Sequence, residues 1–246
     1  LGAPESYLQH LLYLKKGEEW SRRDLSLKLA EIGYTRNDTD TPRGTFRVRG
    51  DTFDIHLSGE ETLRRVVFDD VEITGFYTHN PITGENAPCG DDLAVWPARH
   101  YTSDPATLTN AVSKISSELQ ERLTTLRSEG KLLEAQRLEQ RSMSDIDMLT
   151  ETGGCAGVEN YSRHLDGREA GEPPYTLLDY FPEDFVVYLD ESHVTIPQLG
   201  ACFAGDLSRK TTLIEHGFRL PMALDNRPMQ FDEWNTMRGQ TVFVSV

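Results

Sequence analysis

The spacing of apolar residues along the chain changes several times, and each change predicts a different kind of element. Residues 4–33 carry apolar side chains at intervals of three and four, which indicates helix. From Thr45 to Leu57 apolar and polar residues alternate on both sides of Gly50 and Asp51. Alternation around a glycine-containing turn predicts a β-hairpin with one buried face.

Two more short strands are expected after this hairpin, at residues 64–68 and 71–77. The Pro-Ile-Thr-Gly stretch at 81–84 has the composition of a turn. We therefore expect residues 35–100 to form a small antiparallel α+β domain.

A pair of long helices is predicted next. Asp104 is a suitable N-cap, with Pro105 at the first helical position. Apolar residues then recur at steps of three and four as far as Leu126, and Gly130 interrupts the pattern. A second helix is expected from Leu132 and Leu133 to a stop at 153–154, and its apolar stripe is expected to be ordinary core packing.

The last third of the chain has the pattern of an α/β protein. Residues 185–189 and 241–246 are short continuous apolar runs, which is typical of strands buried on both faces of a parallel sheet. The predicted fold class is therefore a multidomain combination of α/β and α+β parts.

Composition limits the classes of function. The net charge of −15 argues against a protein that coats nucleic acid by bulk electrostatics, so any DNA contact needs a local basic patch or another part of the protein. The three cysteines are too far apart for a zinc site.

We find no apolar run long enough to span a membrane and no signal peptide, so we expect a cytoplasmic protein. The first residue is Leu1 and the last apolar run reaches Val246, so we expect a piece of a longer protein.

The strongest chemical motif is Asp190-Glu191-Ser192-His193, directly after the predicted strand at 185–189. Ligands of open parallel sheets bind at the carboxyl ends of the strands. Two carboxylates there suit a nucleotide site, in which Asp190 holds Mg²⁺ and Glu191 activates the attacking water. The alternative is an acidic loop that caps the following helix. With His193 the motif resembles motif II of superfamily-two helicases.

The matching phosphate loop is absent from this sequence. Such a loop needs G-x-x-x-x-G-K-[ST], because backbone N–H groups and the lysine contact the phosphates. After the N-terminal region the only Gly-Lys pair is Gly130-Lys131, which lies between two predicted helices and is followed by Leu132. We therefore expect this chain to be inactive as an ATPase by itself.

Arginines form a local exception in this acidic chain. Arg47 and Arg49 are two residues apart on one predicted strand, so they project from the same face, with Arg36 and Arg43 shortly before them. One interpretation is a solvated strand face. The other is a docking surface, because the planar guanidinium pairs with carboxylates through two hydrogen bonds.

Several stretches together resemble the UvrB family, a component of the excinuclease of bacterial nucleotide excision repair. Their order and spacing match over essentially the whole chain, and the stretches are GTFRVRGD (44–51), GKLLEAQRLEQR (130–141), GVENYSRHL (157–165), PPYTLLDYFPEDF (173–185), DESHVTIPQ (190–198) and GFRLPMALDNRP (217–228). The transcription-repair coupling factor is a related family, but its degenerate nucleotide site makes an intact DESH motif favour UvrB.

The resemblance implies four segments. Residues 1–8 would end a first helicase-domain segment, 9–100 would be the domain that interacts with UvrA, and 101–178 would be the helical domain. Residues 179–246 would be a returning part of the first helicase domain, which is a parallel sheet of the phosphate-loop NTPase type. The phosphate loop, the DNA-clamping β-hairpin and the second helicase domain would lie outside this chain.

The resemblance also implies roles for particular residues. Arg36, Arg47 and Arg49 would contact acidic groups of UvrA, and Arg141, Glu159 and Arg219 would lie where the helical domain meets the DNA-clamping hairpin. In the intact protein His193 would couple nucleotide binding to DNA binding.

The implied function is ATP-dependent recognition and verification of DNA damage. The cofactors would be ATP and Mg²⁺, and the partners UvrA, UvrC and damaged double-stranded DNA. The alternatives are a UvrA-binding module without chemistry and a relative of the coupling factor.

Overall fold

The computed structural model describes residues 1–99 and 105–245, and it divides into two compact units. One unit spans residues 5–102, and the other combines residues 1–4 with 103–246. Asp104, the predicted N-cap, and the predicted segment boundary at 100/101 lie outside the described residues. Among the residues described, no helix is both long enough and apolar enough to cross a membrane.

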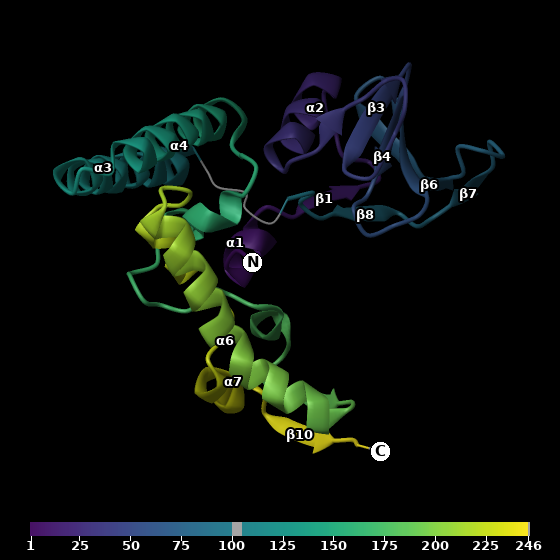
Figure 1. Ribbon diagram of the computed structural model, residues 1–246. Helices are drawn as coiled ribbons and strands as arrows, with labels where there is room; N and C mark the ends of the chain where they lie inside the picture. The colour runs from purple at the N-terminus through teal and green to yellow at the C-terminus, as the bar shows by residue number, and fades with distance from the viewer. Residues whose placement is uncertain (100–104, 246) are drawn as a thin grey trace. The chain divides into compact units, whose positions relative to one another are not determined.

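The first unit is built on a six-stranded sheet in the order β2-β3-β4-β5-β6-β7. Strands β3, β4, β6 and β7 of this sheet are labelled in Figure 1. The four pairs from β3 to β7 are antiparallel, and the short edge strand β2 runs parallel to β3. The strands are β2 (Thr35–Arg36), β3 (Thr45–Arg49), β4 (Thr52–His56), β5 (Leu63–Asp69), β6 (Glu72–His79) and β7 (Asn86–Pro88). The predicted hairpin and the two strands after it are thus present, and Gly50 turns the hairpin with a φ of 56°.

One face of this sheet carries the core of the unit. Phe46, Phe53, Ile55, Val66 and Phe76 project from that face and are at most 2% exposed. They pack in one cluster with the buried side of helix α2 (Arg22–Glu31), which is capped by Ser21. Consecutive strand residues point to opposite faces, so the residues between these apolar ones project from the other face.

The prediction of helix throughout residues 4–33 was wrong in its middle part. Helix α1 (Pro4–Gln9) and helix α2 are present, but Leu12–Lys15 forms strand β1. This strand pairs antiparallel with β8 (Asp92–Val95), and Leu12 lies opposite Val95. The leucine spacing fits a helix, but pairing with a strand about 80 residues later determines the structure.

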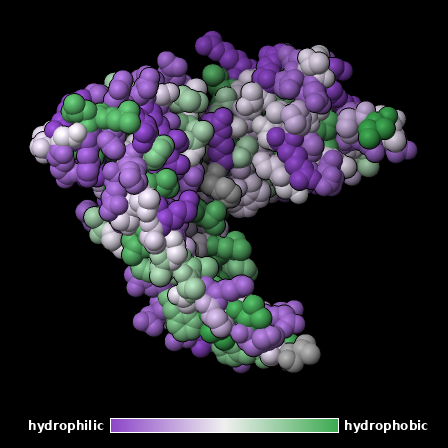
Figure 2. Space-filling view, in the orientation of Figure 1, coloured by the Kyte–Doolittle hydropathy of each residue, from purple (hydrophilic) through white to green (hydrophobic). Residues whose placement is uncertain are grey.

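The second unit begins with the predicted helical pair, α3 (Pro105–Ser128) and α4 (Leu132–Thr152). Gly130 (φ 76°) makes the turn between them, and Gly153 (φ 70°) ends α4 in the left-handed conformation that favours glycine. The apolar stripe is buried between the helices, while the visible surface of the pair is largely hydrophilic (Figure 2). Leu132 and Leu133 do not join this core: they are 66% and 63% exposed, because they stand in the first turn of α4.

The rest of this unit alternates short helices with two strands. The elements are η1 (Val158–Tyr161), α5 (Ser162–Leu165), η2 (Leu177–Tyr180), β9 (Val186–Leu189), α6 (Ser192–Glu215), η3 (Pro221–Asp225), α7 (Phe231–Met237) and β10 (Gln240–Phe243). Strands β9 and β10 are parallel, as predicted, with Val186 opposite Gln240. The prediction that these strands are buried on both faces was wrong, because their residues are exposed or half-buried and each strand has a single neighbour among the described residues.

An ion-pair network joins these segments to the helical pair. Arg163 of α5 donates to Asp225 of η3 over 2.6 Å and also pairs with Glu118 of α3. Burial raises the pKa of the Glu118 carboxyl, but hydrogen bonds from His164 and the Met222 amide and the charge of Arg163 outweigh it and leave that pKa below its usual value.

Candidate functional site

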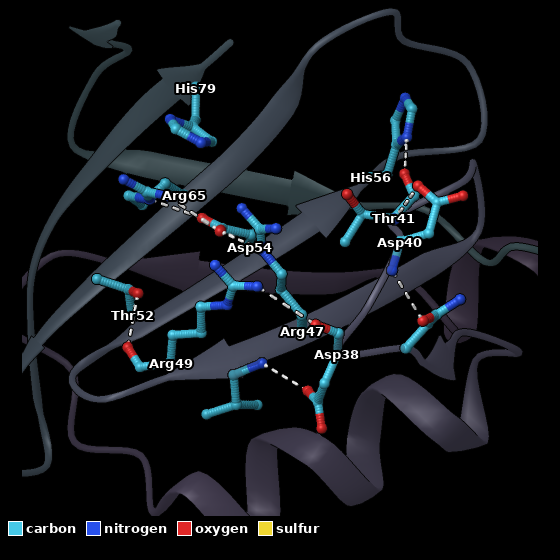
Figure 3. A network of polar contacts seen from close by, with 12 residues as sticks. Asp38, Asp40, Thr41, Arg47, Arg49, Thr52, Asp54, His56, Arg65 and His79 are labelled. Carbon is cyan, nitrogen blue, oxygen red and sulfur yellow. Dashed lines mark hydrogen bonds and ion pairs between the residues drawn. The ribbon is translucent and has the colours of Figure 1, made fainter. Parts of the chain in front are cut away.

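The sheet face that α2 does not cover carries a row of charged residues on three adjacent strands. The register places Arg47 of β3 opposite Asp54 of β4, and Asp54 opposite Arg65 of β5. Figure 3 shows the carboxylate of Asp54 between the two guanidinium groups. Arg47 Nε lies 2.8 Å from Asp54 Oδ2, and Arg65 Nε lies 2.6 Å from Asp54 Oδ1. This Arg-Asp-Arg row is the central polar feature of the face.

Asp54 is buried by the two arginines, with 1% of its surface exposed. Burial by itself would raise the pKa of this carboxyl, but the hydrogen bonds from Arg65 and Arg47 outweigh it and lower that pKa. Asp54 therefore stays ionised and fixes both arginines. Among the described residues, the Arg47 side chain donates its Nε–H to Asp54, and 13% of that side chain is exposed.

The three arginines predicted to dock a partner do not all share one face. Arg47 and Arg49 project from the polar face, as their spacing predicted, whereas Arg36 is in register with the core residue Phe46. Asp38 links the two sides at the edge of the sheet. Its carboxylate accepts from Arg36 Nε over 3.0 Å, and its backbone carbonyl accepts from Arg49 Nη2 over 3.4 Å. The arginines thus surround the β2–β3 edge.

Sequence reasoning missed Asp54 and Arg65, although the sequence held a signal for the first of them. A two-residue turn at Gly50 and Asp51 fixes the hairpin register, and that register puts Asp54 opposite Arg47. Arg65 belongs to the next strand, and its place depends on the length of the connection, which alternation alone does not fix.

The DESH motif lies at the carboxyl ends of the parallel strands β9 and β10, where it was predicted. The backbone N–H of Ser192 donates to the carbonyl of Val244 over 2.8 Å, so the motif is held against the end of β10. His193 Nδ1 lies 2.9 Å from Ser245 Oγ and 3.4 Å from Glu191 Oε2. The motif therefore brings an acid, an imidazole and a hydroxyl together at one sheet edge.

Asp190 and Glu191 have exposed carboxylates. One oxygen of Asp190 accepts from the Glu191 N–H over 2.9 Å, and Glu191 has a φ of 46°, which is uncommon for a residue with a side chain. A single carboxylate with bound waters suits Mg²⁺ beside a phosphate, so Asp190 fits that role. Among the described residues, no three His, Cys, Asp or Glu side chains cluster in a way that could hold a metal ion.

The third predicted set, Arg141, Glu159 and Arg219, is brought together in the second unit. Arg141 Nη2 and Glu159 Oε1 both flank Gly157, and Glu159 and Arg219 line one pocket of about 380 Å³. Burial lowers the pKa of Arg219, and the nearby charge of Arg141 lowers it further. Arg141 also lies 3.7 Å from Asp145. Lys210 and Arg227 also line this pocket, and each is paired with a carboxylate, Lys210 with Asp206 and Arg227 with Glu233.

Comparison with known proteins gives matches to two family models. Residues 12–101 match the UvrB interaction domain, and residues 106–167 match the UvrB third helical domain. The whole chain is 52% identical over 245 residues to UvrABC system protein B of Streptomyces coelicolor, and 53% identical over the same length to that of Mycobacterium bovis. The chain belongs to the UvrB family.

This UvrB chain spans about a third of the length of the curated relatives it matches: it covers 34% of the Streptomyces coelicolor and Mycobacterium bovis proteins and 36% of the protein from Leifsonia xyli. The arginines at the β2–β3 edge fall within the part that matches the interaction domain. Arg141 and Glu159 fall within the helical-domain match. Arg219 and the DESH motif lie beyond both models, in the part matched by the full-length relatives.

Proposed function

We propose that this chain is the part of a UvrB protein that docks UvrA and carries the acidic half of a nucleotide site. The intact protein would carry out ATP-dependent recognition and verification of damaged double-stranded DNA in the cytoplasm. It would also recruit UvrC. The observation that carries the docking proposal is the group of arginines around the β2–β3 edge. It lies within the interaction-domain match, in a chain whose net charge is −15.

Docking would use guanidinium groups that are already held in place. Asp54 and Asp38 hold Arg47, Arg49 and Arg36 near the sheet edge, so little side-chain freedom is lost on binding. Their free N–H groups would pair with carboxylates of UvrA, and Arg is suited to this by its planar fork. The arginines would repel positively charged groups of a partner, so the pairing also gives specificity.

The test is calorimetric titration of this chain with UvrA. Arg49 is the residue to change, because it is exposed, whereas Arg47→Glu would place a second carboxylate beside buried Asp54. We expect Arg49→Glu to weaken binding about tenfold or more. Lys28→Glu on α2 is the matched control, with the same change of charge in the same unit, and it should bind like the unaltered chain. Equal affinity of both variants would contradict the docking proposal.

We propose that β9, β10 and the DESH motif belong to a helicase-like parallel sheet in the intact protein. There Asp190 would hold Mg²⁺, Glu191 would accept the proton of the attacking water, and His193 would link the site to the end of β10 through Ser245. Bound Mg²⁺ would neutralise phosphate charge during hydrolysis. Without a phosphate loop, this chain would have no ATPase activity of its own.

The nucleotide proposal is tested in the intact protein. Replacement of Glu191 by Gln keeps the size of the side chain and removes the base, so we expect ATP turnover to fall by about 10²-fold or more. Binding of UvrA by the same variant should be unchanged, which separates loss of chemistry from loss of folding. Normal turnover by the variant would exclude Glu191 as the base.

A second candidate is a UvrA-binding module that performs no chemistry. The absence of a phosphate loop from this sequence favours it for the chain in isolation. It differs from the first candidate in the intact protein, where it predicts binding of UvrA without ATP turnover, whether residue 191 is Glu or Gln.

A further inference from the structure

A groove of about 550 Å³ lies beside the β2–β3 edge, on the side of the sheet where α2 packs. Its apolar lining comes from Leu27 and Ala30 of α2 and from Phe46 and Val48 of β3. Leu27 is 53% exposed and Val48 is half-buried. The groove therefore presents apolar surface that the fold itself leaves open.

The helix position of Leu27 explains why it stays outside the core. Leu25, Leu29 and Ile32 follow the spacing of one helix face and are fully buried against the sheet. Leu27 is two residues from Leu25 and Leu29, so it lies on another side of the helix. Arg23 lies four residues before Leu27 and Ala30 three residues after it. These spacings place both on the same face of α2 as Leu27.

The charge of the groove is unlike that of the chain. Arg22, Arg23 and Arg36 line it, and no carboxylate among the described residues does. Arg22 pairs with Asp51, and Arg36 pairs with Asp38. Arg23 is exposed, and within residues 1–99 and 105–245 it makes no ion pair with another side chain. An apolar floor with an arginine rim suits an apolar side chain that is flanked by carboxylates.

We propose that this groove receives an apolar side chain from an acidic segment of the docking partner. The proposal rests on the docking function proposed above and extends it, because Arg36 belongs both to the groove and to the arginine-rich edge. The partner would then contact both faces of the sheet at this edge, with carboxylates toward Arg49 and an apolar anchor beside Leu27. A nucleic acid fits less well, because a phosphate backbone offers nothing to the apolar floor. A second copy of this chain is also acidic, with a net charge of −15. Light scattering distinguishes self-association of this chain from binding of an acidic segment of UvrA.

The test is titration with UvrA of variants at exposed positions, which should fold normally. We expect Leu27→Glu to weaken binding about tenfold or more, because it places a carboxylate at an apolar anchor site. Arg23→Ala should weaken it about threefold to tenfold and reduce its dependence on salt. Val71→Glu and Lys28→Ala are matched controls in the same unit, and they should bind normally.

The outcomes separate this inference from the docking proposal. Weaker binding by Leu27→Glu and Arg23→Ala, with normal controls and unchanged circular dichroism, supports the groove. Normal binding by Leu27→Glu, while Arg49→Glu binds weakly, overturns the groove and leaves the docking proposal in place. If Leu27→Glu instead changes only self-association in light scattering, or only binding of a DNA oligonucleotide, the occupant is not an acidic protein segment and the inference is wrong.

Discussion

At the scale of single residues, Asp54 has a carboxylate that is 1% exposed on a sheet face that α2 leaves uncovered. Two arginines compensate the loss of hydration, with N–O distances of 2.6 to 3.0 Å. A buried ion pair contributes little net stability compared with an apolar core, but removal of one partner is strongly destabilising. Asp54 therefore stabilises the fold, in the sense that its removal leaves two arginines unpaired, and it also holds Arg47 in position.

We predict that Asp54→Asn lowers the free energy of unfolding of the first unit by about 3 kcal/mol, because two half-buried arginines lose their counter-charge. Urea denaturation of a Trp234→Phe background measures this, since Trp20 and Trp96 both lie in residues 5–102. Asp51→Asn is the control: its side chain is 67% exposed, so its pair with Arg22 should contribute little. A midpoint equal for both variants would contradict the prediction.

The same carboxyl predicts a pH dependence. Its pKa is lower in the folded protein than in the unfolded chain. Its stabilisation is therefore complete above the unfolded pKa of about 3.9 and is lost as the pH falls through the folded pKa. We expect the stability difference between the unaltered chain and Asp54→Asn to shrink in acid. A difference that stays constant between neutral and strongly acidic pH would show that Asp54 does not titrate in this way.

At the scale of elements, Gly217 joins α6 to the helical pair. It follows α6 with a φ of 71°, and a Cβ atom built on it would lie 2.3 Å from the backbone oxygen of Glu134 in α4. Arg137 of α4 reinforces this approach by donating to the carbonyl of His216 over 2.7 Å. Only glycine lets the two backbones come this close.

We predict that Gly217→Ala destabilises the second unit by about 3 kcal/mol, through a left-handed backbone and a backbone clash that α4 relieves only by moving. Gly130→Ala is the matched control, because Gly130 has a φ of 76° but nothing within 4 Å of a built Cβ. Gly130→Ala should lower the free energy of unfolding by only about 1 kcal/mol. Thermal melting followed by helical circular dichroism compares the two, and equal midpoints would refute the role of the close approach.

The elements also show what the sequence could predict. Local patterns were sufficient for the β3–β4 hairpin and for α3 and α4, because turn glycines and side-chain spacing specify them within a few residues. They failed for β1, whose partner β8 is about 80 residues away, and for the burial of β9, which depends on how many strands lie beside it. At the candidate sites, spacing placed Arg47 and Arg49 correctly but could not reveal Arg65 or the groove beside Leu27, since both depend on packing between separate elements.

At the scale of the whole molecule, the two units differ in how well their sheets are supported. The first unit has six strands and a continuous core. The sheet described in the second unit has two strands, with Tyr188 74% and Phe243 47% exposed. A sheet of only two strands is marginally stable.

We therefore predict that amides of β9 and β10 exchange with solvent faster than those of β4 and β5, because they open at a lower free energy. Hydrogen exchange followed by mass spectrometry measures this difference in one experiment. The helices α3 and α4 serve as an internal reference within the second unit. Equal protection of both sheets would mean that β9 and β10 are stabilised by contacts other than those of the strand pair.

The two-stranded sheet has a further consequence for handling the protein. Within the described part of the chain each of its strands has one unpaired edge, and the sequence of β9, Val-Val-Tyr-Leu, carries no lysine, proline or other residue that discourages pairing with a foreign strand. Two copies that meet there can continue the sheet from one to the other. Turbidity should therefore rise with concentration, and Tyr188→Lys, at a side chain that is already in solvent, should keep concentrated solutions clear.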